Sequence, residues 1–279
     1  MSKPNINQDN LKVKTAVREH YAEAAVKKNR CCGDSNCGCG TRKNKDEITS
    51  TDFYKKGDLE SLPEEVTGIS LGCGDPVTLA SLRPGQTVLD LGSGGGIDCF
   101  IAGNKVGPTG RVIGVDMTPE MLDRARASCI KLNADNVEFR LGEIEHLPVS
   151  DNVIDVVISN CVINLSTDKP QVLQEIFRVL KPGGRMAVSD IVTRGELPET
   201  VKTSLSAWAG CIAGAMDGDE MVVIMKKIGF SEITLTPVYF TKEMAQEIVQ
   251  QLSIPASVDV DKVLTSIFSA DISAKKPKK

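Results

Sequence analysis

The stretch Val88-Leu89-Asp90-Leu91-Gly92-Ser93-Gly94-Gly95-Gly96 decides the fold of this 279-residue chain. A short apolar run leads straight into a glycine-rich turn, and a second apolar run begins at Ile97. Glycines allow positive φ and let a ligand touch the backbone, while a helix that starts at the turn presents free N–H groups. The stretch therefore predicts a strand, a turn and a helix that bind a ligand together.

Short apolar runs alternate with amphipathic stretches on both sides of this turn. We expect strands at Thr87–Leu91, Arg111–Val115, Asn136–Arg140, Ile154–Ser159 and Met186–Ile191, and helices through Cys99 and Ala102, over Pro119–Lys131 and over Lys169–Leu180. Such alternation is typical of a parallel sheet covered on both faces. The predicted fold class is α/β, with a Rossmann-like, doubly wound, mostly parallel sheet.

The flanking segments predict two appendages to this core. Residues 1–60 combine a helix over Leu11–Lys28 with a cysteine-rich segment, residues 61–195 form the core, and residues 196–279 form a small α+β region. In that last region we expect helices through Trp208 and Cys211, over Met221–Ile228 and near Glu243–Leu252, and a strand over Ile233–Phe240. From about Thr241 onward no role is assigned.

Composition excludes several classes of function. The hydrophobic fraction is 41% and the charged fraction 25%, both ordinary for a globular protein. The net charge of −4 gives no general basic face for nucleic acid. The N-terminus lacks the apolar run of a signal peptide, and no stretch approaches the roughly 20 apolar residues that span a bilayer. We expect a cytoplasmic protein with neither nucleic-acid nor membrane partners.

Cysteine usage is the anomaly of the composition, with nine cysteines against two histidines. In a long chain with an odd cysteine number, reactive or ligating thiols are a better expectation than a disulfide framework. Two histidines leave little room for a catalytic triad or a multi-histidine metal site.

The second strand ends in an acidic residue that indicates a nucleoside ligand. Asp116 lies 20 positions after Gly96, where a carboxylate accepts hydrogen bonds from both ribose hydroxyls. The dinucleotide fingerprint needs glycine or alanine at position 97, and this chain has Ile97. An NAD-linked dehydrogenase, the main alternative within this fold, is therefore disfavoured.

The G-x-G-x-G spacing of the turn resembles motif I of class I methyltransferases. This resemblance implies S-adenosylmethionine as cofactor, with Asp90 near its amino group and adenine read after the third strand. The cofactor-binding residues that it implies are Asp90, Gly92, Ser93, Gly94, Asp116, Met117, Gly142, Glu143, Ile144 and Asn160.

Three further segments resemble the arsenite methyltransferases. They are Ser70-Leu71-Gly72-Cys73-Gly74-Asp75-Pro76, Ser159-Asn160-Cys161-Val162-Ile163-Asn164-Leu165 and Gly210-Cys211-Ile212-Ala213-Gly214-Ala215. Generic methyltransferases need no cysteine at any of these places, and the similarity runs from about Val17 to Phe230.

The resemblance implies that Cys73, Cys161 and Cys211 hold trivalent arsenic as substrate. Thiolates suit this soft, thiophilic element. Three sulfurs would leave the arsenic lone pair facing the methyl group, and no general base would be needed. Arsenite and methylated trivalent arsenicals are then substrates and products, Cys32 or Cys31 assists, and thioredoxin or glutathione serves as thiol reductant.

Other interpretations of the cysteines stay open. Cys31 or Cys32 together with Cys37 and Cys39 would be a zinc knuckle, although two clean C-x-x-C pairs are missing. Cys99 and Cys129 fall within helical patterns and fit small core residues. A carbon or oxygen methyltransferase with incidental thiols, or a non-catalytic metalloid-binding protein, are the alternative functions.

Overall fold

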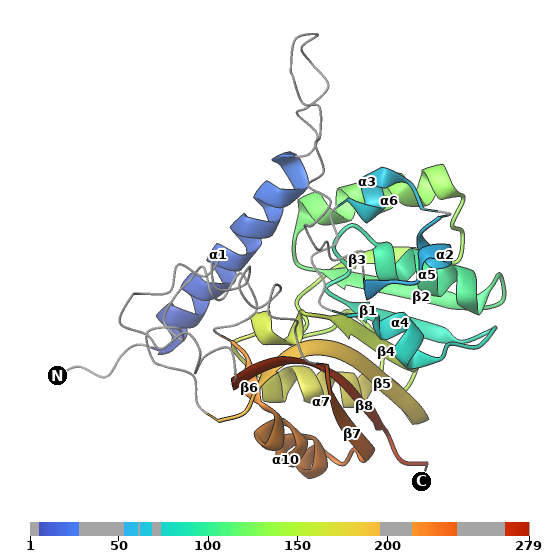
Figure 1. Cartoon of the computed structure of the whole chain (residues 1–279). Helices are drawn as coiled ribbons and strands as arrows, with labels where there is room; N and C mark the ends of the chain where they lie inside the picture. The colour runs from blue at the N-terminus through green and yellow to red at the C-terminus, as the bar shows by residue number, and fades with distance from the viewer. Residues whose placement is uncertain are drawn as a thin grey trace.

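An 8-stranded sheet forms the centre of the molecule. The computed structural model describes residues 6–27, 53–60, 62–68, 74–195, 214–238 and 266–278. The strands are β1 (Thr87–Leu91), β2 (Arg111–Asp116), β3 (Val137–Leu141), β4 (Ile154–Asn160), β5 (Leu180–Thr193), β6 (Met216–Asp217), β7 (Ser231–Val238) and β8 (Ile267–Lys275). Their order is β3-β2-β1-β4-β5-β8-β7, and β6 pairs with β5 (Figure 1).

Helices cover both faces of the sheet, as the alternating pattern predicts. One face packs against α4 (Pro76–Ala80), α5 (Ile97–Val106) and α6 (Pro119–Leu132), and the other against η2 (Ile163–Leu165), α7 (Lys169–Val179) and α10 (Gly218–Ile228). Successive residues of β1 divide between the two cores, since Val88 joins the first and Leu89 the second. The predicted doubly wound α/β fold is confirmed, with β1 to β5 parallel to one another.

The strand β8 is a difference from our sequence-based expectation, which placed no strand there. It pairs antiparallel with both β5 and β7, so it is an interior strand of the sheet. Its apolar residues Phe268, Ala270 and Ile272 are buried in the core. Ser269 and Asp271 alternate with them, and Asp271 accepts a hydrogen bond of 2.9 Å from Ser189 Oγ on β5. A polar partner on the neighbouring strand thus accommodates a polar residue that interrupts the apolar pattern of β8.

The N-terminal helix α1 (Ile6–Lys27) rests on the core beside α6 (Figure 1). Ala25 of α1 packs against Met121, and Arg124 Nη1 of α6 donates to the Ala25 carbonyl oxygen over 2.5 Å. The short helices α2 (Lys56–Leu59) and α3 (Glu64–Thr67) follow. Within the described ranges, no helix combines the length and apolar character needed to cross a membrane.

The expected helices through Trp208 and Cys211 and near Glu243–Leu252 lie outside the described residues, as does the cysteine-rich segment before Thr51. The observed α10 and β7 agree with the expected helix over Met221–Ile228 and strand over Ile233–Phe240 to within a few residues.

Candidate functional site

The sheet reverses its strand order between β1 and β4, and the candidate site lies at the carboxyl ends of these strands. Leu91 of β1 pairs with Ser159 of β4, so the glycine-rich turn and Cys161 follow adjacent strands at the same edge. Ligands of open α/β sheets bind at such a switch point. The topology therefore brings the predicted cofactor turn and one predicted arsenic ligand together.

The glycine-rich turn has the backbone conformation that its sequence predicts. Gly92 and Gly94 have φ of +66° and +49°, in the left-handed region that favours glycine. A β-carbon at Gly94 or Gly95 would meet no atom within 4 Å, so the space above this part of the turn is open. Gly96 ends the turn as the N-cap of α5. The turn thus exposes backbone to a ligand at the start of a helix.

Asp116 is held at the end of β2 by backbone donors. Its Oδ2 accepts from Gly94 N at 2.9 Å and its Oδ1 accepts from Thr118 N at 2.8 Å. Burial raises the pKa of this carboxyl, and the backbone hydrogen bonds lower it in part. The Thr118 side chain and the Met117 backbone also donate to this carboxyl, which lines the pocket. The expected nucleoside-binding role of Asp116 stays a prediction that this geometry fits.

A pocket joins these residues to the turn after β3. It is lined by Lys14, Tyr21, Gly92, Gly94, Asp116, Met117, Thr118, Gly142, Ile144, Glu145, Val162, Leu165 and Ser166. Six of these are residues that we predicted to bind the cofactor, and Glu143 lines the adjoining groove. The open turn, the ribose carboxylate and this lining fit S-adenosylmethionine.

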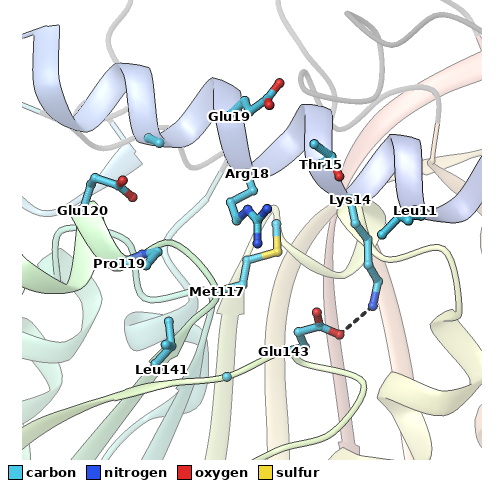
Figure 2. A pocket seen from close by; sticks show the side chains of 12 residues that line it. Leu11, Lys14, Thr15, Arg18, Glu19, Met117, Pro119, Glu120, Leu141 and Glu143 are labelled. Carbon is cyan, nitrogen blue, oxygen red and sulfur yellow. Dashed lines mark hydrogen bonds and ion pairs between the residues drawn. The ribbon is translucent and has the colours of Figure 1, made fainter.

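Helix α1 contributes pocket residues that sequence reasoning missed. Lys14 Nζ donates to Glu143 Oε2 over 2.8 Å and lies 3.2 Å from Glu145 Oε1. Figure 2 shows Lys14 and Arg18 pointing from α1 toward Glu143 and Met117. Burial of Lys14 lowers its pKa, but its contacts with Glu143 and Glu145 outweigh burial and raise the net value. The pattern of polar residues along α1 did not indicate that Lys14 and Arg18 would face the turn after β3.

Asp90 lies beneath the turn rather than on the surface of the pocket. It is 2% exposed, and the thiol of Cys99 donates to its Oδ2 over 3.2 Å. Burial, followed by the charge of Asp98, raises the pKa of Asp90 well above its usual range. Its expected place near the cofactor's amino group stays a prediction.

Cys161 follows β4 in a backbone conformation that is rare for its residue type. Its φ is +57°, its side chain is buried, and its N–H donates to Ser189 O over 2.8 Å. A non-glycine residue in this region costs of order 1–3 kcal/mol and often marks a functional site. Cys161 is disulfide-bonded, whereas Cys99 and Cys129 are free.

Hydrogen bonds to β5 hold the turn after Cys161 in place. Asn164 Nδ2 donates to Asp190 Oδ1 over 2.8 Å and to Ile191 O over 2.5 Å. Burial raises the pKa of Asp190 to about 7, while hydrogen bonds from the backbone of Ile191 and Asn164 lower it in part. These contacts hold the segment after Cys161 against the sheet.

The structure does not describe the other predicted cysteines of the site. The predicted arsenic ligands Cys73 and Cys211 and the assisting Cys31 and Cys32 lie outside the described residues.

Comparisons with known proteins indicate the family of the chain. Residues 82–269 match the family model described as a methyltransferase domain. The arsenite methyltransferase of Halobacterium salinarum is 41% identical over 278 residues, covering 97% of this chain and 68% of that protein. The human arsenite methyltransferase is 40% identical over 181 residues, covering 62% of this chain and 48% of its own length. The chain therefore spans about half the length of this human relative.

A solved structure also resembles this chain. The arsenic(III) S-adenosylmethionine methyltransferase of Chlamydomonas reinhardtii superposes with a TM-score of 0.65 at 31% identity, covering 83% of this chain and 74% of that one. The sequence match over nearly the whole chain, the methyltransferase domain and the site geometry lead to one conclusion: the chain belongs to the arsenite methyltransferase family.

Proposed function

We propose that this chain transfers methyl groups from S-adenosylmethionine to trivalent arsenic held by Cys73, Cys161 and Cys211. The products are methylated arsenicals and S-adenosylhomocysteine. The observation that carries the proposal is the position of Cys161, which is buried at the switch point in a left-handed turn directly beside the cofactor turn. Family membership supplies the identity of the acceptor.

The residues of the pocket bind and orient the cofactor. Asp116 accepts from the ribose, residues 142–144 border the adenine, and the open backbone at Gly94 leaves room for the chain that leads to the sulfur. When bound, S-adenosylmethionine supplies an electrophilic methyl group to the arsenic lone pair. The protein contributes position and exclusion of water, and well-oriented attack can be worth roughly 7–11 kcal/mol.

Thiolates are the chemistry that the acceptor needs. Arsenic(III) is soft, and cysteine sulfur is a soft ligand. The rigid backbone around Cys161 fixes one sulfur, and the proposal assigns the other two to Cys73 and Cys211. Because the attacking lone pair carries no proton, no histidine or carboxylate has to act as a base. That agrees with a chain that has only two histidines.

We also propose that a thiol reductant, thioredoxin or glutathione, is a co-substrate. The disulfide at Cys161 supports this, because an oxidised cysteine cannot ligate arsenic. Residues 1–60 would supply an assisting thiol from Cys31 or Cys32, and residues 196–279 would supply Cys211. The core at 61–195 would bind the cofactor.

Single serine variants of the three cysteines test the proposal. C73S, C161S and C211S should each bind S-adenosylhomocysteine like the parent but form no methylated arsenic from arsenite, labelled S-adenosylmethionine and thiol reductant. C129S is the matched control, because Cys129 is a half-buried free thiol on α6 away from the switch point. Full methylation of arsenite by all three variants would contradict the proposal. Turnover of an organic acceptor by the parent, in place of arsenite, would favour a carbon or oxygen methyltransferase.

A further inference from the structure

Three side chains from distant segments form a hydrogen-bonded cluster beside the cofactor turn. Tyr54, Asp98 on α5 and Asn160 at the end of β4 are its members, and Tyr54 and Asp98 are both 5% exposed. Tyr54 Oη donates to Asp98 Oδ2 over 3.0 Å. Asn160 Nδ2 lies 3.0 Å from Tyr54 Oη and 3.4 Å from Asp98 Oδ2. Hydrogen bonds to both partners restrict the rotation of the Asn160 amide.

The same amide reaches a fourth segment. Asn160 Nδ2 donates to the carbonyl oxygen of Gly74 over 2.9 Å. Gly74 follows Cys73 in the sequence, and Asn160 precedes Cys161. One hydrogen bond therefore joins the immediate neighbours of two predicted arsenic ligands.

Ser189 of β5 provides a second connection between these two segments. A β-carbon at Gly74 would lie 2.4 Å from Ser189 Cβ, so the Gly74 backbone touches that side chain. The carbonyl oxygen of Ser189 accepts the N–H of Cys161 over 2.8 Å. The segments that carry Cys73 and Cys161 are thus anchored to the same residue of the sheet.

Asp98 serves this cluster as an acceptor of hydrogen bonds. Among the described residues, its donors are the neutral side chains of Tyr54 and Asn160, and its Oδ1 has no partner. Burial raises its pKa to about 7, and the hydrogen bonds from Tyr54 and Asn160 lower it in part. Burying a carboxyl without a cationic partner costs free energy, which the hydrogen bonds from Tyr54 and Asn160 offset in part.

We propose that Tyr54 and Asp98 are positioning residues for the arsenic site: they orient the Asn160 amide, which holds the backbone at Gly74 and Cys161 in register. This inference rests on the proposed function and deepens it. A misplacement of about 1 Å in reacting groups can cost roughly 100-fold in rate. Loosening the cluster should therefore act on arsenic and leave the nucleoside end of the cofactor in place.

The variants Y54F, D98A and D98N separate this role from others. Y54F and D98A should lower kcat/KM for arsenite by roughly 10- to 100-fold through arsenite binding, and the Kd of S-adenosylhomocysteine should change less than about threefold. D98N should recover most of the loss in D98A, because its amide oxygen can accept from Tyr54 while its NH₂ group takes the place of the unpartnered Oδ1. Arsenite binding without cofactor is measured by titration of the reduced protein, followed by thiolate-to-arsenic absorption in the ultraviolet.

N136A is the matched control for loss of a clamping amide. Asn136 precedes β3 at the opposite edge of the sheet. Its Nδ2 donates to Gly103 O in the last turn of α5 and to Gly107 O just after that helix, both over 2.9 Å. N136A should lower Tm without altering arsenite affinity.

Three results would overturn the inference. Y54F and D98A could bind and methylate arsenite like the parent, the affinities for arsenite and S-adenosylhomocysteine could fall equally, or D98N could be as impaired as D98A. A parent protein that binds arsenite without methylating it contradicts the proposed function alone, and one that does not bind it contradicts both.

Discussion

The side chain of Val162 occupies the place where a β-carbon of Gly92 would stand, with both γ-methyl groups 2.5 Å from that position. Gly92 opens the cofactor turn, and Val162 directly follows Cys161. The two turns therefore share one packed contact across the ends of β1 and β4. Any side chain at position 92 has to displace the side chain of Val162, the residue after Cys161.

Gly92→Ala should accordingly disturb both halves of the site. The new methyl group would overlap Val162, and alanine at a φ of +66° is strained, so we expect a loss of about 1–3 kcal/mol in the free energy of unfolding. Affinity for S-adenosylhomocysteine and arsenite should fall together. Chemical denaturation and two separate titrations measure these effects. Gly95→Ala is the control for stability, because a β-carbon there meets nothing within 4 Å; equal destabilisation of the two variants would contradict the argument.

The central part of the fold could be predicted because its signals are local. The glycine turn at 92–96 and the apolar runs of β1, β2 and β4 carry their own pattern, and the acidic end of β2 follows from spacing alone. The strand β8 could not be predicted with the same criteria, because Ser269 and Asp271 interrupt its apolar residues. Their partners, such as Ser189, come from strands more than 30 residues away.

The candidate site, like the fold, could be predicted only where its signals are local in the sequence. Sequence placed Cys161 and Asp116 at strand ends, which topology puts at the same edge of the sheet. It gave no indication that Lys14 would reach Glu143, or that Tyr54 would reach Asp98, because such contacts depend on how separate segments pack. The left-handed turn at Cys161 is also invisible in the sequence, since cysteine has no preference for it.

Lys14→Met should weaken cofactor binding modestly. The variant keeps the length of the side chain but removes the ion pairs that join α1 to Glu143 and Glu145 beside the cofactor pocket. Partly exposed ion pairs contribute about 0.2–1 kcal/mol, so the Kd of S-adenosylhomocysteine should rise roughly two- to fivefold.

Salt provides the check on this interpretation. The difference between Lys14→Met and the parent should shrink at high ionic strength, because added salt screens the same ion pairs in the parent. Lys105→Met is the matched control, since Lys105 pairs with Asp58 at 2.9 Å outside the cofactor pocket. An equal effect of both variants on cofactor affinity would show that α1 is not specifically involved.

Asp116→Asn should impair recognition of the ribose. The amide keeps one acceptor oxygen and places a donor where the second oxygen accepts from a backbone N–H. Hydrogen bonds to charged groups contribute about 1.5–3 kcal/mol, so affinity for S-adenosylhomocysteine should fall at least tenfold. The parent should also prefer S-adenosylhomocysteine over its 2′-deoxy analogue, and the variant should lose that preference. Retained discrimination between the two ligands would assign the ribose to other residues.

The stability of the protein should carry a pH dependence that originates in Asp98. Its pKa is raised from 3.8 to about 7 in the folded state, because burial penalises the charged form. Between these values the folded protein keeps a proton that the unfolded chain releases, so this group's contribution to stability falls as pH rises toward 7 and is constant above it.

Asp98→Asn removes that dependence. The free energy of unfolding of the parent relative to the variant should decline by on the order of 4 kcal/mol between pH 4 and pH 7. Electrostatic coupling of Asp98 to the neighbouring carboxyls reduces this decline. Those neighbours are Asp75, which faces Asp98 from the start of α4, and Asp90 at the end of β1. Both remain in the variant, so the difference between the two curves isolates position 98. Urea denaturation of both proteins at half-unit steps of pH measures it, and parallel curves would show that the pKa of Asp98 is not raised by folding.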